Sequence, residues 1–258
     1  MKITFVGSGN VAWQLSLAMD RAGHNIEQII SRNEDHAKAL AVKFGAHYST
    51  DPKAIYDLVD LVILAVPDDR IAEVCAELPS VNGVLVHTCG VRSMEILKGG
   101  AFRYGVIYPL QTLNKNVDVD MLRVPFLIEG SDSNATSILQ EIAGDISNTV
   151  RYCSSSDRAN YHLAAVFANN FANVLYSMSD EFLKTKELDF DMLKPLIEQT
   201  GRKLDQGTPM EQQTGPAMRG DLQTMKEHLQ MLEDRPEFVE IYRVLSRAIE
   251  RRKPPHNN

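Results

Sequence analysis

Two histidines, an asparagine and an arginine stand where this sequence could transfer protons and bind a carboxylate. His87 ends a short apolar run, and His162 and Asn169 share one face of a predicted helix. Arg219 lies in a segment rich in Gly and Pro. Imidazole titrates near neutral pH and can donate a proton, whereas a guanidinium can clamp a carboxylate bidentately. These residues predict proton transfer at a polarised C=O or C=N bond of a small acid. His87 and His162 would be candidate proton donors, Asn169 would polarise the bond, and Arg219 would orient the carboxylate.

Each of these residues also has a structural interpretation. His87 could be a capping or core histidine, and His162 and Asn169 could make a hydrogen-bonded contact between helices, because buried amides need partners. Arg219 could pair with a nearby Asp at the surface. The sequence leaves these alternatives open. Cys89 follows His87 closely but has no recognisable activating partner, so we interpret it as a small packing residue.

The amino-terminal segment carries the elements of a dinucleotide site. An apolar run at residues 3–6 is followed by Gly7-Ser8-Gly9-Asn10-Val11-Ala12 and then by a helical pattern over residues 11–22. The first glycine allows a tight turn, the second lets a pyrophosphate approach the backbone, and the helix start offers free N–H groups to the anion. We therefore predict coenzyme contacts from Gly7, Ser8, Gly9, Asn10 and Val11. A tight turn without a ligand is the alternative.

The end of the second predicted strand indicates which dinucleotide is bound. NAD sites usually place Asp or Glu there to hold the ribose hydroxyls, but this chain has Ser31-Arg32-Asn33. Hydroxyl, guanidinium and amide groups can all donate to a 2′-phosphate, so NADP is the predicted coenzyme. Ser31 could instead, or also, cap the next helix with Glu34 as its partner. Val66-Pro67, at the end of another apolar run, predicts apolar contacts with the coenzyme.

Strand and helix patterns alternate from the first residues to about residue 152. Unbroken apolar runs such as residues 61–66 are typical of strands covered on both faces, so the fold class is α/β with a doubly wound, mostly parallel sheet. The predicted strands lie at residues 3–6, 25–31, 46–48, 60–66, 84–87, 104–108, 125–128 and 149–152. Beyond the serine run at 154–156 every pattern is helical, at residues 157–186, 190–204, 221–232 and 237–251. The sequence thus predicts a dinucleotide-binding domain at 1–152 and an all-helical domain at 153–258, with a frayed tail at 252–258.

Composition limits the classes of function. The net charge of −7 over 258 residues argues against non-specific nucleic-acid binding. The three cysteines are widely spaced, which predicts neither a disulfide framework nor a metal site. The first strand pattern begins at the amino terminus and leaves no room for a signal peptide, so a cytoplasmic location is expected.

The predicted helix at 157–186 contains no charged residue between Arg158 and Asp180. Both of its faces are therefore expected to be buried, one in the core of the helical domain and the other against polar groups. Four asparagines and a histidine would be costly in a bilayer. We therefore expect a crevice or a dimer interface rather than a membrane span.

Five motifs together resemble a known group of NADP-dependent reductases that join a Rossmann domain to a carboxyl-terminal helical dimerisation domain. They are the Gly7 to Ala12 turn, Val66-Pro67-Asp68, His87-Thr88-x-Gly90, Tyr108-Pro109-Leu110-Gln111-Thr112 and Thr214-Gly215-Pro216-x-x-Arg219-Gly220-Asp221.

The group includes pyrroline-5-carboxylate reductase and deazaflavin-dependent NADP oxidoreductase. The chain is most similar to a branch with a helical domain of unknown function, and its layout also resembles ketopantoate reductases. Members of the branch often carry His where this chain has Tyr108. The resemblance implies an NADP-dependent oxidoreductase with a small-molecule substrate, and a homodimer formed through the helical domain. A non-catalytic NADP-binding sensor or interaction module is the alternative.

Overall fold

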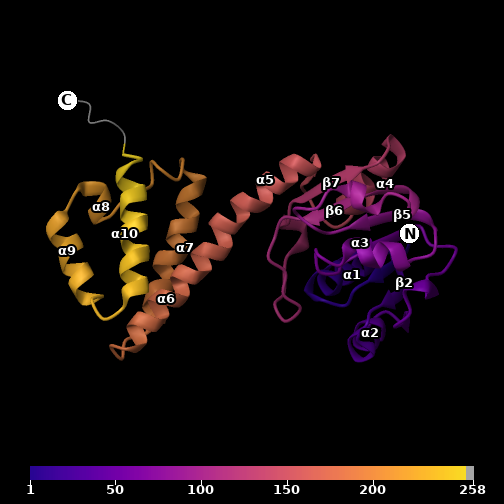
Figure 1. Cartoon of the computed structure of the whole chain (residues 1–258), viewed down its shortest axis with the longest axis horizontal. Helices are drawn as coiled ribbons and strands as arrows, with labels where there is room; N and C mark the ends of the chain where they lie inside the picture. The colour runs from indigo at the N-terminus through magenta and orange to yellow at the C-terminus, as the bar shows by residue number, and fades with distance from the viewer. Residues whose placement is uncertain (254–258) are drawn as a thin grey trace. The chain divides into compact units, whose positions relative to one another are not determined.

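Eight strands form one sheet in the computed structural model, which describes residues 1–253 (Figure 1). The strand order is β3-β2-β1-β4-β5-β6-β7-β8, and every neighbouring pair is parallel except β6 and β7. The strands are β1 Lys2–Val6, β2 Asn25–Ile30, β3 His47–Ser49, β4 Leu61–Leu64, β5 Val81–His87, β6 Ala101–Pro109, β7 Phe126–Gly130 and β8 Val150–Tyr152. The predicted doubly wound, mostly parallel sheet is confirmed, and both of its edges are strands of three residues.

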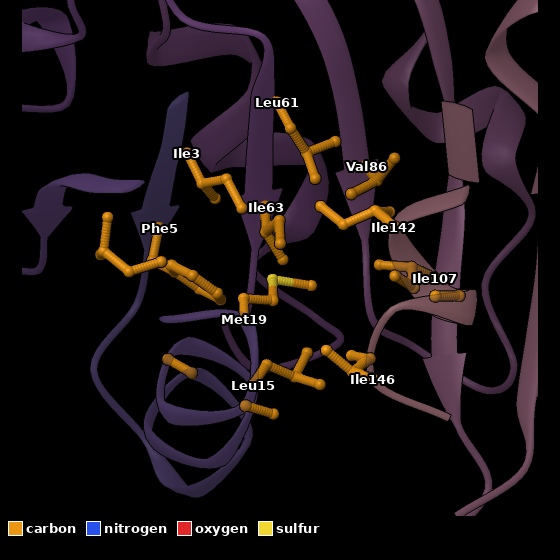
Figure 2. Packing of buried hydrophobic residues seen from close by; sticks show 14 of the residues in the cluster. Ile3, Phe5, Leu15, Met19, Leu61, Ile63, Val86, Ile107, Ile142 and Ile146 are labelled. Carbon is orange, nitrogen blue, oxygen red and sulfur yellow. The ribbon is translucent and has the colours of Figure 1, made fainter. Parts of the chain in front are cut away.

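Apolar side chains fill the space on both faces of the sheet because successive strand residues point to opposite sides. Leu61 and Ile63 of β4 belong to one buried cluster, while Val62 and Leu64 belong to another. Figure 2 shows the first cluster, in which Leu15 and Met19 of one helix pack beneath strand residues such as Phe5 and Ile63. The helices that accompany the sheet are α1 Asn10–Arg21, α2 Glu34–Ala41, α3 Ile71–Glu77, α4 Ser133–Gly144 and α5 Ser155–Ala165. Short helical turns lie at η1 Pro52–Ala54, η2 Met94–Leu97 and η3 Met121–Arg123.

The described residues from 166 to 253 form helices joined by turns, as predicted. A π-helical segment, η4 Val166–Phe171, follows α5 and is continued by α6 Ala172–Lys184. The other elements are η5 Phe190–Leu193, α7 Lys194–Arg202, η6 Lys203–Asp205, α8 Pro216–Arg219, α9 Leu222–Met231 and α10 Pro236–Glu250. A hydrogen bond of 2.9 Å between His228 and Tyr242 joins α9 to α10, and Arg235 pairs with Glu181 of α6 at 2.9 Å.

The chain divides into two compact units, Met1–Asn169 and Asn170–Asn258. This division falls later than the predicted boundary between residues 152 and 153, which remains a prediction, and it leaves α5 with the sheet. Residues 254–258, which include most of the tail predicted to fray, lie outside the described residues. No helix within residues 1–253 combines the length and the apolar character needed to cross a bilayer.

Candidate functional site: a coenzyme groove and the polar ends of three strands

The two glycines of the first turn meet different surroundings. Gly7 has a φ of +116°, and a Cβ placed on it would lie 2.1 Å from the carbonyl oxygen of Ala65, so the fold itself requires glycine there. Gly9 has ordinary backbone angles, and no atom lies within 4 Å of a Cβ built on it. The space in front of Gly9, at the start of α1, is therefore open to a ligand.

A groove of about 340 Å³ begins at this turn. Its lining contains every residue predicted to contact the coenzyme except Asn10 and Val11. The lining residues are Val6, Gly7, Ser8, Gly9, Ile30, Ser31, Arg32, Asn33, His36, Thr50, Pro52, Ala65, Val66, Pro67, Arg70, Val74 and Glu77. The side chain of Asn10 instead accepts a hydrogen bond of 3.1 Å from the backbone N–H of Lys115. Asn10 therefore contributes to holding the segment after β6 against α1.

The segment that follows β2 presents donors to the groove. Ser31 accepts a hydrogen bond of 2.8 Å from Ser8 and retains its own hydroxyl hydrogen. Asn33, rather than Ser31, caps α2, because its side-chain oxygen accepts from the N–H of His36 at 2.9 Å. The helix-cap role considered for Ser31 is thus wrong. Among the described lining residues, Glu77 is the one that carries a carboxylate, and it lies at the end of α3 rather than at the end of β2. The donor set fits a 2′-phosphorylated dinucleotide.

Two further nitrogen-bearing side chains in the lining, His36 and Arg70, were missed from the sequence. Arg70 pairs with Glu73 at 2.5 Å, and its Nε is buried without a hydrogen-bond partner among the described residues. The signal available in the sequence was the position of Arg70, three residues beyond the Val66-Pro67 strand end.

His87 is fully buried, and the structure argues against it as a proton donor. Its Nδ1 accepts from the N–H of Cys89 at 3.1 Å, and its Nε2 lies 3.3 Å from the carbonyl oxygen of Ser93. Burial lowers the pKa of His87 to about 4, so the ring is neutral at physiological pH. The core-histidine interpretation therefore describes this residue. Cys89 is buried as well, and burial is the main reason that its pKa is raised to about 11, so its thiol stays protonated.

The polar face of the helical stretch formed by α5 and η4 meets the end of β6 and the segment that follows it. His162 Nδ1 lies 3.0 Å from the hydroxyl of Tyr108, and Asn169 Nδ2 donates to Thr112 Oγ1 at 2.6 Å. The structure therefore brings together two of the predicted catalytic residues and the Tyr108–Thr112 motif. The carboxyl ends of β4, β5 and β6 lie at one edge of the sheet, where ligands of such folds bind.

A buried arginine that the sequence did not reveal fixes the start of α5. Arg158 is fully buried and pairs with Glu129 of β7 at 2.7 Å. Its guanidinium also donates to the carbonyl oxygens of Cys89 at 3.2 Å and Arg92 at 2.5 Å. Because these contacts engage β7 and the segment after β5, Arg158 orients the helical face that carries His162 one turn later.

The apolar face of the same stretch does not behave as predicted. Leu163 is 58% exposed and Phe167 64% exposed, and in α6 Val174 is 51% exposed. The prediction that both faces are buried is therefore wrong for the single chain.

Arg219 lies in the second compact unit, which begins at Asn170. Its side chain is exposed, and its Nη2 is 3.9 Å from Asp221 Oδ2. Asp221 in turn caps α9 by accepting from the N–H of Thr224 at 3.1 Å. The surface pair considered in the sequence is thus present, and the role of Arg219 toward a carboxylate remains a prediction.

Comparison with known proteins places this arrangement in a class. Residues 2–89 match the family model described as NADP oxidoreductase, coenzyme F420-dependent, and residues 124–249 match a domain of unknown function, DUF2520. A candidate NADP oxidoreductase from Bacteroides fragilis is 38% identical, with a TM-score of 0.90 over 97% of this chain and 98% of that one. A Thermotoga maritima protein is 26% identical, with a TM-score of 0.71 over 96% and 97% of the two chains. No curated protein matched the chain.

More distant structures share the fold. Pyrroline-5-carboxylate reductase from Coxiella burnetii is 18% identical, with a TM-score of 0.56 over 97% of this chain and 96% of that one. The fold and groove thus define a Rossmann-type oxidoreductase with a helical carboxyl-terminal domain. The chain belongs to the family of NADP oxidoreductases that includes the Bacteroides protein. The predicted family resemblance, enzyme class and coenzyme are confirmed.

Proposed function

We propose that this protein reduces a C=O or C=N bond of a small, carboxylate-bearing substrate. The observation that carries the proposal is the shared sheet edge, at which the coenzyme groove opens beside Gly9 and at which β6 presents Tyr108 to His162. Bound NADPH supplies the hydride. The residues of this chain bind the coenzyme, orient the substrate and deliver a proton.

The coenzyme side of the proposal rests on the donors at the end of β2. Ser31, Arg32 and Asn33 would hold the 2′-phosphate through charge-assisted and neutral hydrogen bonds, and Val66 and Pro67 would provide apolar contacts. A free N–H group at the first turn of α1 would face the pyrophosphate.

The substrate side rests on Asn169, His162 and Arg219. Asn169 uses one amide hydrogen on Thr112 and keeps a second for a substrate oxygen or nitrogen. His162 would serve proton transfer, and Arg219 would orient the carboxylate.

The test is NADPH consumption, followed by its absorbance, with a panel of small 2-oxo acids and cyclic imino acids that includes pyruvate and 1-pyrroline-5-carboxylate. We expect oxidation with at least one class, and loss of turnover in His162→Ala and Arg219→Ala. Unchanged turnover in both variants would refute the site assignment. Tight NADPH binding without oxidation by any compound would favour the non-catalytic sensor.

We further propose that a second copy of the chain covers the helical unit. Of residues 170–253, only Ala217 and Ser246 are buried, whereas helices of this length need a shared apolar core. An apolar hollow of about 440 Å³ is lined by residues of α6, α9 and α10 such as Leu175, Met231 and Leu245. A homodimer would bury these side chains.

Sedimentation velocity tests this proposal. We expect a dimer for the wild type and a shift toward monomer for Leu175→Glu. Leu58→Glu is the matched control, because Leu58 is 81% exposed and belongs to the sheet unit. A wild-type monomer at micromolar concentration would refute the dimer.

A further inference from the structure

Two titratable side chains from separate elements meet at the sheet edge. The hydroxyl of Tyr108, on β6, lies 3.0 Å from Nδ1 of His162, on α5, and the two rings stand edge to face with centroids 6.1 Å apart. Both side chains are only partly buried, so the contact lies within reach of a ligand at this edge. His87, the other histidine considered for catalysis, has no such access.

The backbone around this contact is shaped to admit it. A Cβ on Gly90 would lie 2.6 Å from Nδ1 and 2.8 Å from Cγ of His162, so a side chain at position 90 would displace the imidazole. Arg158 anchors the helix that carries His162, because it ties α5 to Cys89 and Arg92 in the same segment as Gly90. Gly90 leaves room for the imidazole and Arg158 anchors its helix, so together they fix the ring next to Tyr108.

The charge state of Tyr108 suits a donor. Burial raises its pKa above the usual value, and neighbouring Cys89 and Asp68 act in the same direction, while Arg158 acts against them. The phenol is therefore protonated at neutral pH. Its hydrogen is available to another molecule when the Nδ1–H of His162 donates to the phenol oxygen.

We propose that Tyr108 delivers the proton of the reduction and that His162 restores it. This rests on the proposed reductase function. As hydride adds to the substrate carbon, the electron pair of the C=O or C=N bond moves to the oxygen or nitrogen, which takes the proton of the Tyr108 hydroxyl. The phenolate takes the Nδ1 proton of His162 while a proton from solvent adds to Nε2, so the ring stays neutral throughout and no imidazolate forms. His162 thus acts as a relay, which refines its predicted role as the direct donor.

The variant Tyr108→Phe removes the hydroxyl and keeps the ring. Tyr104→Phe is the matched control, because Tyr104 lies on the same strand and its hydroxyl contacts Glu95 at 3.3 Å instead. With the panel substrate that the wild type reduces, we expect kcat to fall by roughly 10²- to 10⁴-fold in Tyr108→Phe, the range for loss of a general acid. The KM and the dissociation constant of NADPH should stay within about threefold, and Tyr104→Phe should be close to wild type. Near-wild-type kcat in Tyr108→Phe would overturn the proposal.

His162→Gln gives a second readout. We expect a lower kcat and a changed pH profile, with Asp68, Cys89 and Arg158 as the other titratable or charged groups beside the phenol. A pH profile identical to that of the wild type would contradict the relay.

The ¹⁵N chemical shift of His162 Nδ1 tests the contact without any substrate. Tyr108→Phe should change this chemical shift and Tyr104→Phe should not, and an unchanged chemical shift in Tyr108→Phe would overturn the relay. A wild type that binds NADPH but reduces no compound would refute the reductase function and the proton step together. A wild type that turns over and tolerates Tyr108→Phe would refute the proton step alone.

Discussion

Replacing each glycine of the first turn by alanine should separate folding from coenzyme binding. At Gly7, alanine would have to adopt a φ of +116° with its Cβ 2.1 Å from the Ala65 oxygen. Backbone strain and overpacking cost about 1–3 kcal/mol each, so we expect Gly7→Ala to lose about 2–6 kcal/mol of unfolding free energy. That loss is a large part of the stability of an ordinary domain, about 5–15 kcal/mol.

At Gly9 the same methyl group meets nothing within 4 Å, and the φ of −80° suits alanine. The entropy gain of about 0.4–1 kcal/mol from Gly→Ala is offset by a poorer helix N-cap, a loss of up to about 1 kcal/mol. Stability should therefore change by less than about 1 kcal/mol. The methyl group would keep the pyrophosphate from the first turn of α1, and losing one charge-assisted hydrogen bond, about 1.5–3 kcal/mol, weakens binding about 10- to 150-fold.

Urea denaturation and NADPH titration by calorimetry measure the two effects separately. Gly144→Ala serves as a control, because Gly144 also has open space around its Cβ position and ends α4 away from the groove lining. It should leave NADPH affinity unchanged. Wild-type NADPH affinity in Gly9→Ala would refute the placement of the pyrophosphate at this turn.

Three further results are expected. Arg32→Ala should weaken NADPH binding by about tenfold, the loss of one exposed charge-assisted contact, and leave NADH binding unchanged; calorimetry showing an equal loss for both would contradict the 2′-phosphate assignment. His87 takes up its proton near pH 6.5 when unfolded but at about pH 4 when folded, so the free energy of unfolding should fall by about 3 kcal/mol as the pH drops from 6.5 to 4. Urea denaturation at several pH values should show that His87→Gln lacks this part of the pH dependence of the unfolding free energy. Arg158→Met should cost about 3–5 kcal/mol, because the Glu129 carboxylate stays buried without its partner, and chemical denaturation of the double variant with Glu129→Leu should recover part of that loss.

The sheet was predictable because its strands are apolar on both faces. In residues 61–64, for example, alternate side chains belong to the two buried clusters on opposite faces of the sheet. The groove was predictable from the glycine turn and Ser31-Arg32-Asn33. In contrast, the direction of a side chain at a strand end depends on tertiary packing, so the position of His87 could be predicted but its burial could not.

The long helical stretch shows a second limit. Its faces were assigned at 100° per residue, which assumes an unbroken α-helix. The π-helical turn at Val166–Phe171 changes that spacing. Residues before and after the turn that were assigned to one face at 100° per residue therefore do not share a face. The sequence indicated only that Arg158 is the charged residue at the start of this stretch. Its partner, the buried carboxylate of Glu129, lies on another element, and the sequence does not reveal that pairing.

The three-residue strands at the two margins of the sheet have a consequence for behaviour in concentrated solution. Each edge strand exposes few unpaired backbone N–H and C=O groups, so another chain can form few backbone hydrogen bonds with it. Aggregation by strand pairing at the sheet edges is therefore disfavoured. A protein built around an eight-stranded sheet can in this way remain dispersed, with no helix or loop required as a cover along its margins.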